Sequence, residues 1–410
     1  MCLPSELLSV LLNDWLEWKE VARLDIVICN KIERESWLEL LKNECVFTSL
    51  SEPHCYKWLC SRHIKTRTLT ISDQDIFNNK SILEWLQSTA PFLTTTTLVN
   101  LVPIINGLWS LSGGRLRNLL VDGCTVDAAF WQQVRNNPQL VQLQITSSSV
   151  LNHRNERVPT NLLLQHVRNL DLRWNDLLFS YVSGLIIQLH SLQSLKLEDV
   201  NLSEICRFLP KACPLLVYLD LSCANPINDF NASFCVLMAN LKLGLRCLLL
   251  PSFVTLTTHE LQLITQYHSH SLRCFRILYS VSFDRDALPN LINGLTHVHT
   301  LRVDAQSVSV IMQKRITNRT ITHLILSFRH AAVDLNLLFL RQFQAVTKLS
   351  LLDYRDYTSI ATNVTRLRAM RPLIHTVYVD KEEFVYPLRT ALPSLKVLLH
   401  TDIDIFVEKF

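Results

Sequence analysis

The sequence predicts an α/β solenoid, in which parallel strands alternate with helices and each unit packs only against its neighbours. The first observation is a recurring phrase of leucine, two variable residues, leucine, one variable residue and leucine. Clean copies occupy residues 192–197, 216–221 and 245–250. The second observation is composition: 48% of the residues are hydrophobic and only seven are glycine. There is ample apolar material for a continuous core, and little for glycine-rich catalytic loops.

The repeat spacing defines the unit. The middle apolar residue of each copy serves as its marker: Leu119, Leu143, Leu170, Leu195, Leu219, Leu248, Phe275, Leu301, Leu324, Leu349, Val377 and Leu398. Successive markers are 21 to 29 residues apart, which is the length of a leucine-rich repeat with one strand and one helix or turn. An earlier copy centres on Leu69, and a blurred one lies between Phe92 and Leu101. Residues 66–410 are therefore expected to form about thirteen or fourteen repeats, as an arc with the parallel sheet on its inner face.

Amphipathic segments separate the predicted strands. In the segment 202–209, Leu202, Ile205, Cys206 and Leu209 recur at helical spacing. Residues 182–189 and 130–134 play the same part in their own repeats. We therefore expect a helix between the strands of each of these repeats.

The first 45 residues lack the phrase and show helical spacing instead. One helix is expected around Leu3 to Leu16, a second from Trp18 to about Asn30, and a third from about Glu33 to Lys42. Three short amphipathic helices bury little by themselves, so this module must dock on the first repeat or on a partner. Residues 46–65 are interpreted as a connector with short helical pieces.

The module resembles an F-box. Leu3-Pro4-Ser5-Glu6-Leu7-Leu8 followed by Leu11-Leu12 looks like its opening, and Val27-Ile28-Cys29-Asn30-Lys31 resembles its second half. Trp15-Leu16 and the late position of Lys31 depart from the pattern. The resemblance implies a leucine-rich-repeat receptor of a Skp–cullin–F-box ubiquitin ligase, with adaptor contacts on one set of residues: Leu3, Pro4, Leu7, Leu8, Leu11, Leu12 and Trp15. The alternative is that residues 1–45 only cap the solenoid, as terminal repeats require.

The variable positions of the phrase define a candidate binding surface. Alternation along a strand sends the leucines to the core and the intervening residues to the opposite, solvated face. On a concave sheet, such residues bind proteins or peptides. The candidates are Asp171, Arg173, Lys196, Glu198, Tyr218, Asp220, Arg276, Arg302, Asp304, Tyr378 and Asp380.

Composition and motifs argue against nucleic-acid or membrane binding, catalysis and metal binding as the main role. The net charge of +4, from 40 basic and 36 acidic residues, gives no electrostatic case for nucleic acid or an anionic membrane as the main partner. No phosphate-binding glycine loop or hydrolase motif is present, and we expect no enzymatic activity and no cofactor. His54, Cys55, Cys60 and His63 do not match structural zinc spacing, so a packed helix and no metal are expected there.

The cellular setting is expected to be reducing. The N-terminus shows no secretory signal, and the twelve scattered cysteines do not form a disulfide framework. Free thiols and a cytoplasmic or nuclear location follow as expectations. The sequence favours a non-enzymatic substrate receptor for ubiquitin-dependent degradation. The alternative is a free-standing scaffold or inhibitor without a ligase link.

Overall fold

The computed structural model describes most of the repeat array and part of the N-terminal helices. The described residues are 18–28, 31–44, 46–47, 55–72, 79–100, 115–126, 128–150, 162, 164–173, 179–225, 230–251, 254–277, 282–283, 287–304, 316–328, 342–353, 360–362, 364–365 and 373–399. The chain divides into two compact units, Met1–Asp199 and Val200–Phe410. Each unit is described by itself below.

The first unit begins with helices. They are α2 (Trp18–Val27), α3 (Lys31–Glu44), α4 (Cys55–Ser61) and α5 (Lys80–Thr89), with the short strands β1 (Val46–Phe47) and β2 (Lys65–Thr66) paired in parallel. Asp25 of α2 is buried, and its Oδ2 lies 2.9 Å from Nε of Arg62, just after α4. Arg34 of α3 lies 3.6 Å from the other carboxylate oxygen. This ionic contact ties α2 to the start of the array.

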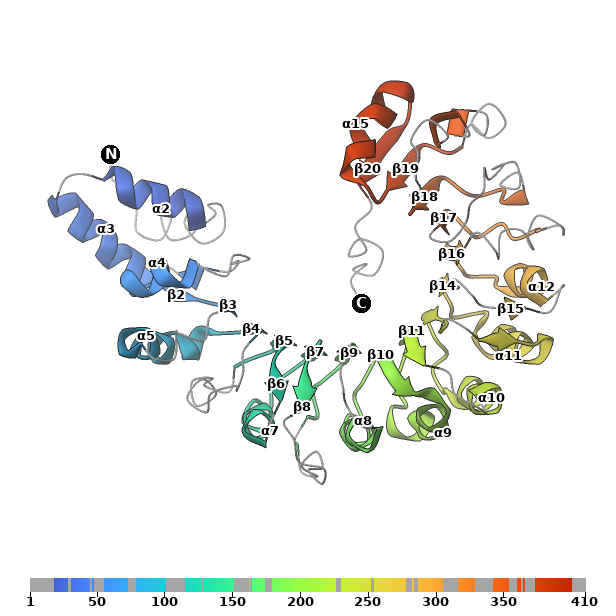
Figure 1. Cartoon of the computed structure of the whole chain (residues 1–410), viewed down its shortest axis with the longest axis horizontal. Coiled ribbons are helices and arrows are strands. Elements are labelled where there is room, and N and C mark those ends of the chain that lie inside the picture. Colours follow the sequence, from blue (N-terminus) through green and yellow to red (C-terminus); the bar gives the residue numbers. More distant parts are fainter. Residues whose placement is uncertain are drawn as a thin grey trace. The chain divides into compact units, whose positions relative to one another are not determined.

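The sheet of the first unit has parallel neighbours in chain order. Its strands are β3 (Thr68–Ile71), β4 (Thr95–Val99), β5 (Asn118–Asp122), β7 (Gln142–Thr146), β9 (Asn169–Arg173) and β10 (Ser194–Asn201), the last of which continues two residues past the unit boundary. The helical pieces η3 (Ala90–Phe92), α7 (Ala128–Arg135) and α8 (Phe179–Ile186) lie on one side of these strands (Figure 1). Two short strands, β6 (Thr125–Val126) and β8 (Ser149–Val150), pair outside this sheet.

The second unit repeats the plan. Its strands are β11 (Tyr218–Asn225), β12 (Cys247–Leu249), β14 (Cys274–Arg276), β16 (Thr300–Asp304), β17 (His323–Ser327), β18 (Lys348–Leu352), β19 (Thr376–Val379) and β20 (Lys396–Leu399). Its helices are α9 (Leu202–Ala212), α10 (Phe230–Asn240), α11 (Thr258–His268), α12 (Ala287–Gly294) and α15 (Glu382–Ala391). Strands β13 (Thr255–Leu256) and β15 (Ser282–Phe283) pair apart from the main sheet.

The predicted register is confirmed for all markers but one. Leu119, Leu143, Leu170 and Leu195 pair in line across the first unit. From Leu219 to Val377 the second unit does the same, and every one of these markers is buried. The exception is the last: Val377 pairs with Val397, and the marker placed at Leu398 was wrong by one residue. Val397 is buried whereas Leu398 is half-buried, so the side chain of Val397 points to the core there.

The two weak early copies are also strands. Leu69 of β3 pairs with Thr96 of β4, which pairs with Leu119. Thr96 is buried, and its branched side chain suits a strand although it is not leucine. The fold is therefore an α/β leucine-rich-repeat solenoid, as predicted.

The helices follow the predicted pattern where they are described. In α9, Leu202, Ile205, Cys206 and Leu209 are all buried. The second and third N-terminal helices were predicted at 18–30 and 33–42 and observed as α2 and α3. The predicted first helix lies outside the described residues. In α11, the Thr257 side chain accepts a hydrogen bond from the His259 amide while Glu260 accepts from the Thr257 amide, a reciprocal cap.

Three strands of the first unit end in tight turns. Asn100, Gly123 and Ser147 directly follow β4, β5 and β7, and all three have a positive φ. The amide of each donates to the carbonyl at or near the end of the next strand, as Gly123 does to Thr146 at 3.0 Å. A Cβ on Gly123 would lie 2.2 Å from Oδ1 of Asn100, so glycine is required there by both conformation and space.

Candidate binding face of the sheet

The open face of each sheet is the side opposite the helices. It carries the residue that follows each marker, and these residues pair in register along the sheet. They are Thr70, Thr97, Leu120, Gln144, Asp171 and Lys196 in the first unit, and Asp220, Leu249, Arg276, Arg302, Ile325, Ser350, Tyr378 and Leu398 in the second. Because successive repeats place equivalent residues side by side, the open face is a row of one side chain per repeat.

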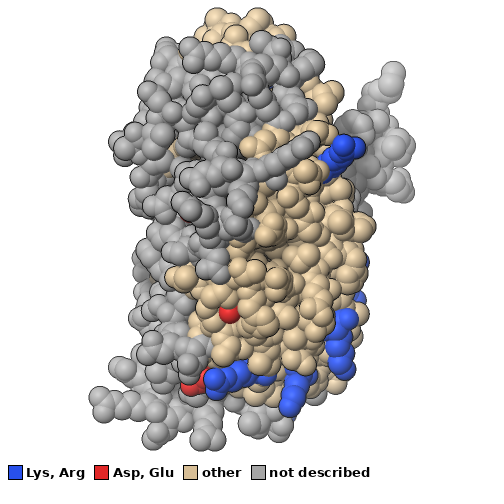
Figure 2. Space-filling model, turned by 90° about the vertical axis from the view of Figure 1, so that its right-hand side faces the viewer, with Lys and Arg blue, Asp and Glu red and all other residues tan. Residues whose placement is uncertain are grey.

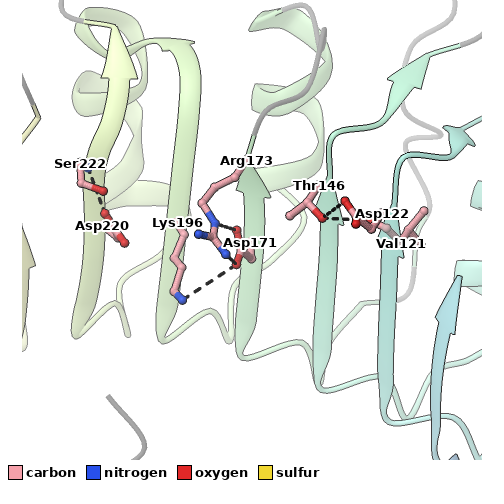
Figure 3. Close-up of polar contacts among 8 residues, drawn as sticks. All are labelled: Val121, Asp122, Thr146, Asp171, Arg173, Lys196, Asp220 and Ser222. Carbon is pink, nitrogen blue, oxygen red and sulfur yellow. Dashed lines mark hydrogen bonds and ion pairs between the residues drawn. The ribbon is translucent and has the colours of Figure 1, made fainter. Parts of the chain in front are cut away.

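A charged cluster occupies the open face of the first unit. Asp171 accepts two hydrogen bonds from Arg173, at 2.7 Å from Nε and 2.8 Å from the terminal nitrogen (Figure 3). Lys196, directly opposite on β10, lies 3.9 Å from Oδ2 of the same carboxylate. Two cations therefore lie around one carboxylate in this cluster. The bidentate geometry fixes the guanidinium plane, so this part of the face is pre-organised.

A second polar contact lies two strands earlier. Thr146 donates through Oγ1 to Oδ1 of Asp122 at 2.8 Å (Figure 3). The two residues are paired at the ends of β7 and β5. This bond holds the acidic side chain at the edge of the face, at a position that the sequence analysis did not name.

The open face of the second unit begins with an apolar cluster. Tyr218, Cys247 and Leu249 pack together with Cys274, and their exposed fractions are 4%, 2% and 0% for the first three. The expectation was a solvated tyrosine. Tyr218 is instead buried, because the side chains of three adjacent strands close around it.

Burial sets the protonation of this cluster. The pKa of the Tyr218 hydroxyl lies far above its ordinary value, first because of burial and then because of the nearby Asp220 carboxylate. Burial also raises the pKa of the Cys247 thiol, and the hydrogen bond with Cys274 adds to the effect. The Tyr218 hydroxyl and the Cys247 thiol are therefore neutral, and Cys247 lacks the thiolate character of nucleophilic cysteines.

Charged residues border the apolar cluster. Asp220 is buried, and its Oδ1 accepts from the amide of Ser222 at 2.9 Å (Figure 3). Arg276 is half-buried, and its Nε is shielded from solvent without a hydrogen-bond partner among the described residues. Arg302 is half-buried and Asp304 is buried. A buried donor without a partner costs roughly 1–3 kcal/mol, and an acceptor from a bound molecule would remove that cost.

An aromatic pair follows further along the second unit. The rings of His323 and Tyr378 lie 5.5 Å apart, and Nε2 of His323 lies 2.8 Å from Oγ of Ser350. A serine–histidine contact of this length can activate a nucleophile, but Ser350 is fully buried. The contact positions the ring beside half-buried Tyr378. The sequence analysis missed His323, although it precedes its marker as Thr300 precedes Leu301.

The remaining predicted residues have structural contacts. Asp380 accepts a hydrogen bond through Oδ2 from the amide of Asp353, and Asp353 accepts one from Ser327 at 2.7 Å. These two hydrogen bonds link the ends of β17, β18 and β19. Glu198 on β10 is half-buried. The face therefore brings together Asp171, Arg173 and Lys196 in one place and Tyr218, Asp220 and Arg276 in another.

The N-terminal module exposes apolar side chains. Ile26 and Val27 of α2 are 73% and 71% exposed, and Ile32 of α3 is 75% exposed. The predicted adaptor contacts Leu3, Pro4, Leu7, Leu8, Leu11, Leu12 and Trp15 lie outside the described residues. The exposed residues are a further candidate surface, which the sequence analysis did not single out.

The described residues contain neither a cluster of metal ligands nor a helix that could span a membrane. No group of three or more His, Cys, Asp or Glu side chains there could hold a metal ion. The predicted helix around Cys60 is observed as α4, with Tyr56 and Leu59 buried. The cysteines whose state is described are free thiols. None of the described helices is both long and apolar enough to cross a bilayer.

Comparisons with known proteins find likeness only in structure. No family model and no curated protein matches the chain. An internalin (inlF) of Listeria monocytogenes str. 4b F2365 is 15% identical with a TM-score of 0.39, covering 80% of this chain and 93% of its own. Rad7 from the yeast Rad7–Elc1 complex is 15% identical with a TM-score of 0.39, and the match covers 98% of this chain and 93% of Rad7. TLR13 from the TLR13–ssRNA13 complex is 17% identical with a TM-score of 0.42, and the match covers 90% of this chain and 52% of TLR13. At these values the likeness carries no argument about what this chain binds.

Proposed function

We propose that this chain is a protein-interaction protein that holds its target on the open face of the sheet. The Asp171–Arg173–Lys196 cluster carries the proposal. Its side chains are ordered by ion pairs before any partner arrives, so binding would cost little side-chain entropy. Arginine and tyrosine, the residue types that anchor protein interfaces most often, also lie on the open face of the second unit, at Arg276, Arg302 and Tyr378.

The second part of the proposal concerns the N-terminal helices. We propose that they bind a Skp-type adaptor and, through it, a cullin, so that the chain serves as a substrate receptor for ubiquitin transfer. The F-box resemblance supports this role, and so do Ile26, Val27 and Ile32. Exposed apolar side chains that gather on neighbouring helices are typical of protein-interaction sites.

A free-standing scaffold is the second candidate. The buried contact of Asp25 with Arg62 favours it, because a module that is tied to the array by an ion pair serves well as a cap. In that case the helices would stabilise the first repeats, and no ligase component would bind.

The open-face proposal is tested by a charge reversal. Tagged Lys196→Glu protein is compared with Lys80→Glu, which makes the same change on helix α5 of the same unit. We expect Lys196→Glu to lose the proteins that wild type captures from extract, and Lys80→Glu to retain them, while thermal unfolding of the two variants matches. Equal capture by both variants would exclude this part of the face.

The adaptor proposal is tested with purified Skp-type adaptor in size-exclusion chromatography. Wild type should co-elute with the adaptor. Two double variants should not: one carries Ile26→Asp and Val27→Asp, and the other carries Leu7→Asp and Leu8→Asp. Ile187→Asp with Val236→Asp is the matched control, since both residues are also exposed. If wild type does not bind the adaptor, the chain is a scaffold and the ligase role is wrong.

A further inference from the structure

The second unit carries a set of basic residues along one edge of its sheet. The basic edge consists of Lys242, Arg246, His270, Arg273, His297 and His299, in the turns that lead from helices α10, α11 and α12 into strands β12, β14 and β16. All six are exposed. None of them belongs to the open face, because they precede the strands rather than alternate within them.

Backbone hydrogen bonds fix the spacing of this edge. The amide of Arg246 donates to the carbonyl of Val217 at 2.7 Å, that of Arg273 to Arg246 at 2.8 Å, and that of His299 to Arg273 at 2.8 Å. Neighbouring strands in such a ladder lie about 4.8 Å apart. The backbones of Arg246 and Arg273 are therefore held side by side on neighbouring repeats by these hydrogen bonds.

No carboxylate balances this row within its own turns. The described turn residues 213–217, 241–246, 269–273, 295–299, 316–322 and 343–347 contain no Asp or Glu. Within the described part of the chain, no ion pair involves Arg246 or Arg273. Like charges opposite each other on neighbouring strands are destabilising, and the negative ends of α10 and α11 supply only partial charge. A bound anionic molecule would offset the repulsion.

The first unit provides a contrast at the same repeat position. There Arg67, Arg117 and Arg168 alternate with uncharged Thr94 and Val141 along the equivalent hydrogen-bonded row. The consecutive cations are a property of the second unit. In Figure 2 the described residues of one face are mostly uncharged, and the Lys and Arg among them lie mainly toward the lower and right-hand margins.

Apolar residues interrupt the basic edge. Leu243 lies in the turn before β12, and Leu215 lies in the neighbouring turn before β11; they are 53% and 40% exposed. The turn ranges 213–217, 241–246, 269–273 and 295–299 contain no Phe, Tyr or Trp, whereas surfaces that bind single-stranded nucleic acid use large aromatic side chains to stack bases. Cations with exposed leucines fit a protein segment that carries carboxylates and aliphatic side chains together.

We propose that the basic edge is a second interaction surface, separate from the open face, which binds an acidic protein segment with interspersed leucine-like residues. The carboxylates of the segment pair with Arg246, Arg273 and Lys242, and its aliphatic side chains contact Leu243 and Leu215. A segment that binds along the basic edge contacts several successive repeats. Its charged and aliphatic residues must therefore follow the same order as the side chains of those repeats.

The test uses fluorescence anisotropy with the full chain and a labelled peptide of glutamates with interspersed leucines. Matched peptides replace glutamate by glutamine, or leucine by serine. Wild type should bind the glutamate–leucine peptide at least about fivefold more tightly than either, since both charge and apolar contact contribute. Arg246→Glu with Arg273→Glu should weaken binding by about tenfold or more.

A matched control separates the edge from total charge. Arg23→Glu with Lys80→Glu makes the same change in net charge on exposed residues of α2 and α5, and should leave binding within about twofold of wild type. Circular dichroism confirms that both double variants fold. Equal binding by the edge variant and wild type, or no binding by wild type at about 1 mM peptide, would overturn the proposal. Tighter binding of oligouridylate that the edge variant abolishes would assign the edge to nucleic acid instead.

Discussion

Lys196 in the first unit and Leu249 in the second occupy the same position of the repeat, directly after the marker on the open face. Lys196 is half-buried and lies beside the Asp171 carboxylate, whereas Leu249 is fully buried among Tyr218, Cys247 and Cys274. The period is the same in both cases. What differs is the set of side chains on adjacent strands, so neighbouring repeats decide whether an open-face residue faces water.

Two side-chain clamps fasten one repeat to the previous one by different chemistry, although a glutamine clamp also occurs in the second unit, where Gln342 accepts from the amide of Ile316 at 2.7 Å. In the first unit, Gln188 accepts from the amide of Leu162 at 2.9 Å and donates to Gly184 at 2.8 Å. In the second, His268 accepts from the amide of Leu245 through Nδ1 and pairs through Nε2 with the carbonyl of Met238, both at 3.0 Å. The amide cannot titrate and the imidazole can, so the second unit gains a sensitivity to pH that the first lacks at this clamp.

The largest expected effect is common to both units and tests the register. Leu195→Asp and Leu301→Asp each place an unpaired carboxylate in the core, which should cost about 4 kcal/mol or more of unfolding free energy. Arg302→Glu, next to the second site, should cost far less, and we also expect it to weaken target binding. Urea denaturation compares the three variants, and a reversed ranking would show that the assigned faces are exchanged.

The comparison of Lys196 with Leu249 is tested next. Leu249→Ala should destabilise the chain by about 3 kcal/mol, because it leaves a cavity in a closed apolar cluster. Lys196→Ala should cost less than about 1 kcal/mol, since a half-exposed ion pair contributes little. Denaturant midpoints measure both, and similar losses at the two positions would mean that the open faces are alike.

The clamp predicts a pH effect through His268. Burial lowers the pKa of this histidine from 6.5 to about 4, so the unfolded chain takes up a proton at a higher pH than the folded chain. Stability is complete above the unfolded pKa and falls as pH decreases from 6.5 toward 4, by about 2 kcal/mol at pH 5. Thermal unfolding across this range measures it. His268→Gln, which can keep both hydrogen bonds, should flatten the profile, and an unchanged slope would exclude His268 as its source.

The smallest effect concerns the charged cluster. Asp171→Asn removes the charge that Arg173 and Lys196 share, and should cost less than about 1 kcal/mol because both cations reach solvent. Added salt should shrink the difference between Asp171→Asn and wild type, while leaving the loss caused by Leu249→Ala unchanged. Melting temperatures in low and high salt distinguish the two units, and a salt-independent loss at Asp171 would indicate a packing role.

The sequence predicts the repeats well, because the marker residues are chosen by one requirement, burial against the neighbouring repeat. It is weaker where several residues meet that requirement. Around β20, Leu395, Val397, Leu398 and Leu399 allow more than one register, and only pairing with β19 selects Val397. In β4, a run of threonines hides the strand because leucine is absent from the marker position.

The candidate face is predicted only in outline. Alternation places Asp171, Tyr218 and Arg276 on the open side, and the structure puts them there. It does not reveal that Asp171 and Asp220 are buried or that Tyr218 is enclosed, because those outcomes depend on side chains about one repeat away. The clamps of Gln188 and His268 also escape prediction, since a polar residue at a helix end has no distinctive spacing.

The clamps have a consequence for how the chain acquires its structure. His268 reaches back 30 residues to Met238 and 23 to Leu245, and the backbone rungs join residues of adjacent repeats in the same way. Loops that must close are therefore short and of nearly constant length, which keeps the entropic barrier to each step small. Structure can begin in any pair of repeats and spread outward one repeat at a time, so a partly synthesised chain already holds ordered repeats.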